Sequence, residues 1–312
     1  MTEFRDRLRQ LLGPLPAFTP LNPYVEYRAD LGDVYREQVC YNVEPGERVR
    51  AYLFTPKGLL DAERRPAVLA HHQHNDEFQL GKSEVAGLAG HPDQAYALEL
   101  ARRGFVVLAP DALGFEERGP YAGELAAPVT QTVGGNRERF EFTRRVLNGS
   151  CLQAKLVSDM QRGLDYLQTR PEVDGGRLGA IGHSLGGQQT LFLAALDNRV
   201  QAGVSSCGFS SLRSVLREGI NHNFGAYVPG LLAHGDVGDV LRAVAPRPFL
   251  ALNGSDDPIF PIDGLYDSYA TAQPAYEEAG HPERLRVAAR AGGHAFTPEM
   301  RDRAYAWLER WL

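Results

Sequence analysis

The sequence is poor in cysteine and contains no long hydrophobic run. Its three cysteines, Cys40, Cys151 and Cys207, are far apart and odd in number, which excludes a disulfide framework and zinc-ligand spacing. No apolar stretch approaches the roughly 20 residues that a membrane-spanning helix needs. The first residues, MTEFRDRLRQLLG, are charged and lack the apolar centre of a secretory signal. These absences predict a cytoplasmic protein with buried or incidental thiols.

An excess of basic charge is also missing. The 312 residues have a formal net charge of −6 and a pI of about 5.9. This balance argues against nucleic acid or an anionic membrane as the main partner, and it selects no substrate. The hydrophobic content of 43% is ordinary for a soluble globular protein, and the length suits a large α/β domain.

Short apolar runs alternate with helical patterns along most of the chain. Strands are predicted at PAVLAHH, FVVLAPD, RLGAIG, VQAGVSSCG, RPFLALNG and LRVAAR. Helices are predicted at DQAYALELARRG with Asp93 as N-cap, at 152–167, at LGGQQTLFLAAL and at the C-terminus. This alternation predicts an α/β fold with a mostly parallel central sheet and helices on both faces. A short N-terminal helix and extended segments over 24–54 precede it and predict an antiparallel N-terminal portion.

Two long stretches interrupt this alternation. One covers 112–149 and is rich in Gly, Glu and Arg, and the other covers 209–244. Irregular segments of this length in a compact α/β domain are usually functional loops or caps. We therefore predict a single domain over 1–312 with two insertions that shape the binding pocket.

The stretch GHSLGG lies where the strand RLGAIG meets the helix LGGQQTLF. Because the pattern G-x-S-x-G sits between a strand and a helix, it predicts a nucleophile elbow with Ser184 exposed at the turn. Gly182 and Gly186 would leave room where side chains would collide. The N–H of Leu185, at the start of the following helix, is predicted to stabilise an oxyanion. An idle serine in a glycine-rich turn is the alternative.

A nucleophilic serine needs a base, and the base needs an orienting acid. His294 follows the last predicted strand, and Asp256 and Asp257 follow the strand before it. We favour Asp257 as the acid because it precedes the turn proline in G-x-x-D-P-x-x-P, which leaves Asp256 as a capping residue. Asp111, after an earlier strand, is a further alternative.

With these residues the chain resembles the α/β-hydrolase superfamily, in its dienelactone hydrolase-like and acetyl xylan esterase-like branch. The resemblance rests on PAVLAHHQHN, FVVLAPDALGFEERG, GHSLGG, APRPFLALNGSDDPIFP and GGHAF. It implies the α/β-hydrolase fold and a catalytic triad of Ser184, Asp257 and His294. Dienelactone hydrolases themselves use a cysteine nucleophile, and Ser184 at that position favours hydrolysis of other esters.

The loop HHQHN departs from the H-G-x run with which family members form the oxyanion hole. If His72 takes the place of the family histidine, the N–H of His74 supplies the second oxyanion donor. A register one residue earlier assigns this role to Gln73. A metal site formed by the histidines of HHQH is an alternative, but no set of ligands elsewhere in the sequence completes it.

The sequence therefore predicts a carboxylic ester hydrolase that forms an acyl-enzyme and needs no cofactor or metal. The expected partner is a small-molecule ester, and the sequence is compatible with a homo-oligomer. A peptidase or thioesterase with the same triad is the alternative among enzymes. A non-catalytic binding protein on the same fold is the alternative outside them, and inertness toward serine-directed reagents would favour it.

Overall fold

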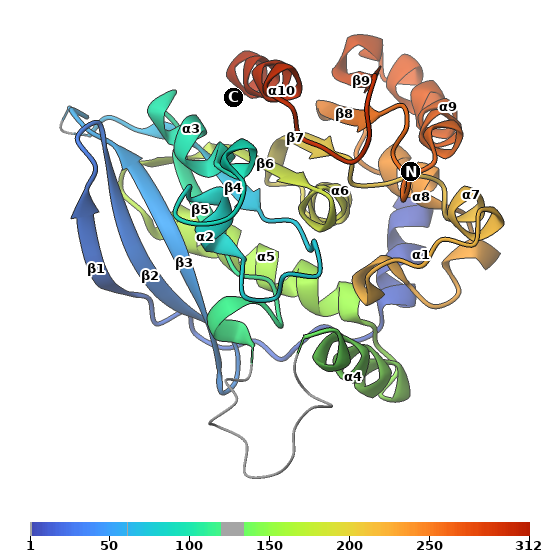
Figure 1. The fold of residues 1–312 in the computed structure, drawn as a ribbon, viewed down its shortest axis with the longest axis horizontal. Helices are drawn as coiled ribbons and strands as arrows, with labels where there is room; N and C mark the ends of the chain where they lie inside the picture. Colours follow the sequence, from blue (N-terminus) through green and yellow to red (C-terminus); the bar gives the residue numbers. More distant parts are fainter. Residues whose placement is uncertain (1, 61, 120–133) are drawn as a thin grey trace.

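The computed structural model describes residues 2–60, 62–119 and 134–312, and its centre is a nine-stranded sheet (Figure 1). The strand order across the sheet is β1-β2-β3-β5-β4-β6-β7-β8-β9. The strands are β1 (Tyr24–Asp30), β2 (Val34–Glu44), β3 (Glu47–Pro56), β4 (Arg65–His71), β5 (Val106–Pro110), β6 (Val173–His183), β7 (Val200–Ser206), β8 (Phe249–Gly254) and β9 (Leu285–Arg290).

The sheet combines an antiparallel and a parallel part. Strands β1, β2 and β3 pair antiparallel, and β3 joins β5 in the same sense. All pairs from β5 through β4, β6, β7 and β8 to β9 are parallel. The predicted fold class, a mostly parallel sheet with an antiparallel N-terminal portion, is confirmed.

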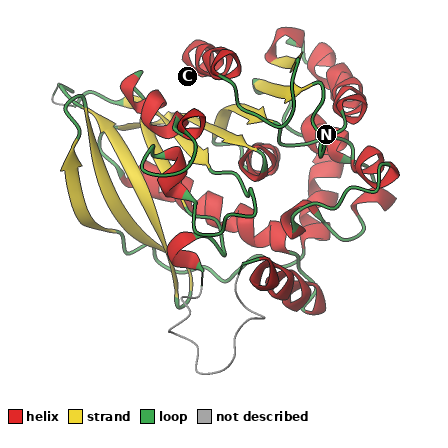
Figure 2. Cartoon of the chain, viewed as in Figure 1, coloured by secondary structure: helices red, strands yellow, loops and turns green. Residues whose placement is uncertain are grey.

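Helices cover both faces of the sheet (Figure 2). Along β4, Ala67 and Leu69 belong to one buried cluster, and Val68 and Ala70 belong to another. This alternation follows from the two-residue period of a strand, and it explains why a strand buried on both faces is wholly apolar. Residues of α1 (Thr2–Leu12), α5 (Leu152–Thr169), α6 (Leu185–Leu196), α8 (Val237–Arg242) and α9 (Ile262–Glu278) pack in the first cluster. Residues of α2 (Lys82–Val85), α3 (Tyr96–Arg102) and α10 (Pro298–Trp311) pack in the second.

The chain leaves β4 and β6 toward opposite sides of the sheet. It runs from β4 through α3 to β5 on one side, and from β6 through α6 to β7 on the other. The loops after β4 and β6 therefore diverge at the carboxyl ends of these adjacent strands. Open α/β sheets bind their ligands in the crevice at such a switch point.

Three local predictions need correction. Asp93 does not cap a helix, because its carboxylate pairs with Arg301 of α10 at 2.9 Å and a 3₁₀ turn, Pro92–Gln94, precedes α3. The predicted insertion 112–149 includes a 13-residue helix, α4 (Gly135–Leu147), while its residues 120–133 lie outside the described part of the chain. The insertion 209–244 is also partly helical, with α7 (Leu212–Arg217) and α8.

Two further predictions concern the cysteines and the lack of a membrane-spanning helix. Cys40, Cys151 and Cys207 are free and buried, as predicted for incidental thiols. Among the helices of residues 2–60, 62–119 and 134–312, none is long and apolar enough to cross a membrane.

Candidate active site

Ser184 occupies the sharp turn between β6 and α6. Its backbone has φ 55° and ψ −120°, a conformation that non-glycine residues rarely adopt. The N–H of Ser184 donates to the carbonyl of Ser206 on the neighbouring β7 at 2.8 Å, which holds the turn against the sheet. A serine held in this conformation between a strand and a helix has the geometry of a nucleophile elbow.

The two glycines of the motif are required by close backbone contacts. A Cβ on Gly182 would lie 2.2 Å from the carbonyl carbon of Gly186, and a Cβ on Gly186 would lie 2.0 Å from the carbonyl oxygen of His71. The predicted steric reason for these glycines is therefore correct. The same contacts bring the end of β4 directly against the elbow.

His294 and Asp257 meet at the carboxyl ends of β9 and β8. The Nδ1–H of His294 donates to Asp257 Oδ2 at 2.7 Å, and Asp257 Oδ1 accepts from the backbone N–H groups of Ile259 and Phe260. Burial alone would raise the pKa of Asp257, but the hydrogen bonds and the adjacent imidazole outweigh it and hold this pKa below its usual value. Asp257 is therefore an ionised acceptor that orients the imidazole.

The two alternative acids lie elsewhere. Asp256 Oδ2 accepts from Ser255 Oγ and from the N–H of Gly292, so its carboxylate braces the loop that leads to His294. Asp111 Oδ2 pairs with Lys82 Nζ at 2.7 Å. Among the described residues, neither Asp256 nor Asp111 forms a hydrogen bond or ion pair with His294.

Aromatic side chains surround the imidazole of His294. The ring of His183, the residue before Ser184, lies 4.9 Å from it, and the ring of Phe260 lies 5.8 Å from it (centroid to centroid). His294 is thus packed beside the elbow. Within the described chain no hydrogen bond joins its ring to the Ser184 hydroxyl, and such contacts often tighten only when substrate binds.

The loop after β4 lies beside the elbow, as an oxyanion loop requires. His72 Nε2 accepts from the N–H of Ala112, and its Nδ1 pairs with the carbonyl of Gln73 at 2.7 Å. The side-chain NH₂ group of Gln73 donates to both oxygens of Glu84, at 3.0 and 3.1 Å. Leu185 is the first residue of α6, so its N–H is one of the amides that the helix leaves free. The oxyanion roles of Leu185, Gln73 and His74 stay predictions.

The histidines of HHQH do not converge on one point. His72 binds backbone groups, whereas His74 Nε2 pairs with Glu138 of α4 at 3.2 Å. Two groups of described side chains lie close enough to share a metal ion, and neither contains a histidine of this loop. They are Cys207 with Asp257 and His294, and Asp111 with Glu116 and Glu117.

Two neighbours of the site were missed in the sequence. Cys207 follows β7 with its thiol close to Asp257 and His294, and its place at the carboxyl end of a predicted strand could have indicated this. Burial raises the pKa of Cys207 to about 12, so the thiol stays protonated. No sequence pattern indicates that Glu138 lies near the site, because the sequence predicts an irregular segment around it.

Buried histidines at the site make the fold sensitive to acid. Burial lowers the pKa of His71 to about 3, of His72 to about 4 and of His183 to about 3. Between about pH 6.5 and pH 4 these histidines bind protons in the unfolded chain but stay neutral in the folded protein, so the free energy of unfolding falls as the pH falls. We expect urea unfolding to give a loss of up to about 4 kcal/mol per pH unit in this window. His71→Gln should reduce this slope by about one third, and an unchanged slope would contradict the assignment.

Comparison with known proteins agrees with this geometry. The model of the dienelactone hydrolase family matches residues 82–237, which is half of the chain. The protein YtaP of Bacillus subtilis (strain 168), a hydrolase by name, is 29% identical over 313 residues, and the match covers 99% of each chain.

Solved structures share the fold at low sequence identity. A glucuronoyl esterase from Solibacter usitatus superposes with a TM-score of 0.71 at 17% identity, covering 99% of this chain and 92% of that one. An acetyl xylan esterase from Paenibacillus sp. R4 gives a TM-score of 0.63 at 21% identity, covering 99% and 94%. The matched family model, which spans the elbow, together with this fold shows that the chain belongs to the dienelactone hydrolase family and is a carboxylic ester hydrolase of the α/β-hydrolase fold.

Proposed function

We propose that the protein hydrolyses carboxylic esters through an acyl-enzyme on Ser184, with His294 as general base and Asp257 as orienting acid. The observation that supports this most strongly is the 2.7 Å hydrogen bond between His294 Nδ1 and Asp257 Oδ2, made next to the strained turn of Ser184. Because Nδ1 donates to Asp257, the free electron pair of His294 is on Nε2, the atom that accepts a proton from a serine hydroxyl.

The reaction follows from these roles. Ser184 Oγ attacks the ester carbonyl while His294 Nε2 takes the hydroxyl proton, and a tetrahedral oxyanion forms. When this intermediate collapses, the bond to the alcohol oxygen breaks, and His294 returns the proton to the leaving alcohol. Water then attacks the acyl-enzyme with His294 again as base, and the carboxylic acid leaves as Ser184 regains its proton.

The oxyanion would be stabilised by backbone N–H groups. Leu185 supplies one at the start of α6, and the second comes from Gln73 or His74 in the loop after β4. Each donor of this kind typically lowers the barrier by about 3–4 kcal/mol, because it is aimed at charge that develops only in the transition state. Asp257 keeps the imidazole in the required tautomer and stabilises the imidazolium that forms.

The test compares the protein with Ser184→Ala on p-nitrophenyl acetate and p-nitrophenyl butyrate. We expect turnover by the unaltered protein and a loss of about 10³-fold or more in the variant. Fluorophosphonate should add one label per chain, mapped to Ser184 by peptide mass. The preferred acyl length would begin to define the pocket. Equal rates in both proteins would remove Ser184 from the mechanism.

A further inference from the structure

Glu138 of α4 is bound to two loops that flank the active site. Its Oε2 pairs with His74 Nε2 at 3.2 Å, and its Oε1 accepts from the backbone N–H of Phe224 at 2.9 Å. The side chains of His74 and Glu138 are only 11% and 10% exposed. One shielded carboxylate thus joins the loop after β4, the helix of the first insertion and the 3₁₀ turn Phe224–Ala226 of the second.

The hydrogen bonds around His74 determine its tautomer. The backbone N–H of Asp76 donates to His74 Nδ1 at 3.1 Å, and an N–H can only donate. The ring proton is therefore on Nε2, which donates to Glu138. Both oxygens of Glu138 accept from an N–H group, and Gln offers only one acceptor oxygen, so its NH₂ group would face either His74 or the N–H of Phe224 as a second donor. Gln therefore cannot keep both contacts.

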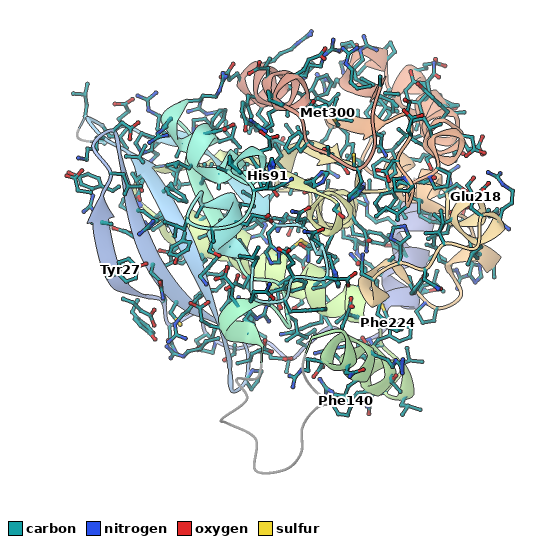
Figure 3. All side chains as sticks on the ribbon, viewed as in Figure 1. Tyr27, His91, Phe140, Glu218, Phe224 and Met300 are labelled. Carbon is teal, nitrogen blue, oxygen red and sulfur yellow. The ribbon has the colours of Figure 1, made fainter. Side chains whose placement is uncertain are left out.

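Aromatic rings pack around His74 and Phe224, the two partners of this carboxylate. The ring of His74 lies edge-on to Phe78 and Phe115, with centroids 4.9 and 5.2 Å apart. The ring of Phe224 lies 5.2 Å from Phe142 of α4. Figure 3 shows Phe224 on the segment that passes next to this helix. These contacts limit access of water, and buried polar groups that lose their partner in such surroundings are destabilised by about 1–3 kcal/mol.

We propose that Glu138 is a positioning residue for the oxyanion loop: it fixes His74 and so aligns the backbone amide of Gln73 or His74 with the developing oxyanion. The inference rests on the proposed function of Ser184. It also assigns a role to the insertions, because α4 and the 3₁₀ turn hold the loop through the same carboxylate. Misalignment of an oxyanion donor weakens binding of the transition state more than binding of the ester.

The test uses Glu138→Gln, with Glu141→Gln as the matched control. Glu141 is a buried glutamate one turn further along α4 whose partners are arginines, Arg137 and Arg144 among them. With p-nitrophenyl acetate, we expect Glu138→Gln to lower kcat about 10- to 100-fold with KM changed less than about threefold. Binding of a boronic acid, which forms a tetrahedral adduct on Ser184, should weaken by the same factor as kcat. Glu141→Gln should stay within about twofold in both.

A second variant, His74→Asn, removes the other partner and keeps the inference testable if Glu138→Gln unfolds easily. Because both variants disturb the contacts of the same carboxylate, we expect the double variant to lose no more kcat than the worse single variant. Additive losses in the double variant would overturn the role of Glu138. Equal kcat in Glu138→Gln and Glu141→Gln while Ser184→Ala is inactive would do the same, and would leave the proposed function intact. Full activity in Ser184→Ala would overturn the proposed function instead.

Discussion

Replacing Asp257 by Asn is expected to lower kcat for p-nitrophenyl acetate by about 10⁴-fold. Asp257 Oδ2 accepts the Nδ1–H of His294, while Oδ1 is already bound to two backbone N–H groups. In the variant the carbonyl oxygen of Asn stays on these N–H groups, so its NH₂ group faces His294 and favours the tautomer with the proton on Nε2. An imidazole protonated there cannot accept the proton of Ser184.

Asp256→Asn is the matched control for this prediction. It changes the adjacent carboxylate, which braces the loop through Ser255 and Gly292 and does not touch the imidazole. We expect its kcat to stay within about tenfold of the unaltered protein, since Asn keeps an acceptor oxygen for these two exposed hydrogen bonds, each of which is worth about 1 kcal/mol. The prediction for Asp257 would be wrong if the two variants lost activity equally, because the acid would then not act through His294.

Replacing Lys82 by Met is expected to reduce the free energy of unfolding at pH 7 by about 3–5 kcal/mol. The Lys82 side chain is fully buried, and its Nζ contacts Asp111, Glu116 and Glu117. Burial opposes the charge of Lys82, but these carboxylates raise its pKa above the usual value. Burial opposes the charge of Asp111 as well, and the ammonium of Lys82 counteracts this effect. Without the ammonium, three carboxylates would repel one another in a largely buried site that water screens poorly.

The exposed pair of Lys57 and Asp30 provides the control. The side chain of Asp30 is 60% exposed, and Lys57→Met should reduce the free energy of unfolding by less than about 1 kcal/mol. The loss of unfolding free energy in Lys82→Met should be smaller at pH 5.5 than at pH 7. Without Lys82, folding is coupled to uptake of a proton at Asp111, so the variant gains stability relative to the unaltered protein as the pH falls. Urea unfolding at both pH values measures this. A deficit that stayed constant with pH would show that lost packing, not uncompensated charge, is the cause.

The Lys82 cluster also bears on the active site. Asp111 Oδ1 accepts the backbone N–H of Lys82, and the N–H of the next residue, Ala112, donates to His72 Nε2 in the loop after β4. The cluster therefore fixes the loop after β5 to the loop after β4. Asp111 follows a strand, as a triad acid would, but its carboxylate binds Lys82 and stabilises these loops instead.

Much of the fold could be predicted because its signals are local. The apolar run of β4 is buried on both faces, and this burial requires apolar residues at consecutive positions. The steric demand at Gly182 and Gly186 is local as well, since it arises within one strand-turn-helix unit. The choice of Asp257 over Asp256 rested on a turn proline, and the hydrogen bond to His294 agrees with it.

The errors arose where distant contacts outweigh local preference. Asp93 is a good N-cap residue, but an ion pair with Arg301, more than 200 residues away, holds its carboxylate instead. Helix α4 is rich in charge, and its Glu138 binds His74 and the N–H of Phe224, which are 64 and 86 positions away. The helix α9, also absent from the sequence interpretation, contains Pro274, and its burial depends on α8 and the sheet.

The sequence by itself determined the fold class and the strand-turn-helix geometry at Ser184, because periodicity and turn chemistry depend on near neighbours. Only the tertiary structure decided which carboxylate meets His294, which partners the histidines of the β4 loop take, and that Glu138 joins two insertions. These choices depend on burial and hydrogen-bond geometry between residues that are tens of positions apart. Such contacts exist only once the sheet has brought the carboxyl ends of its strands together.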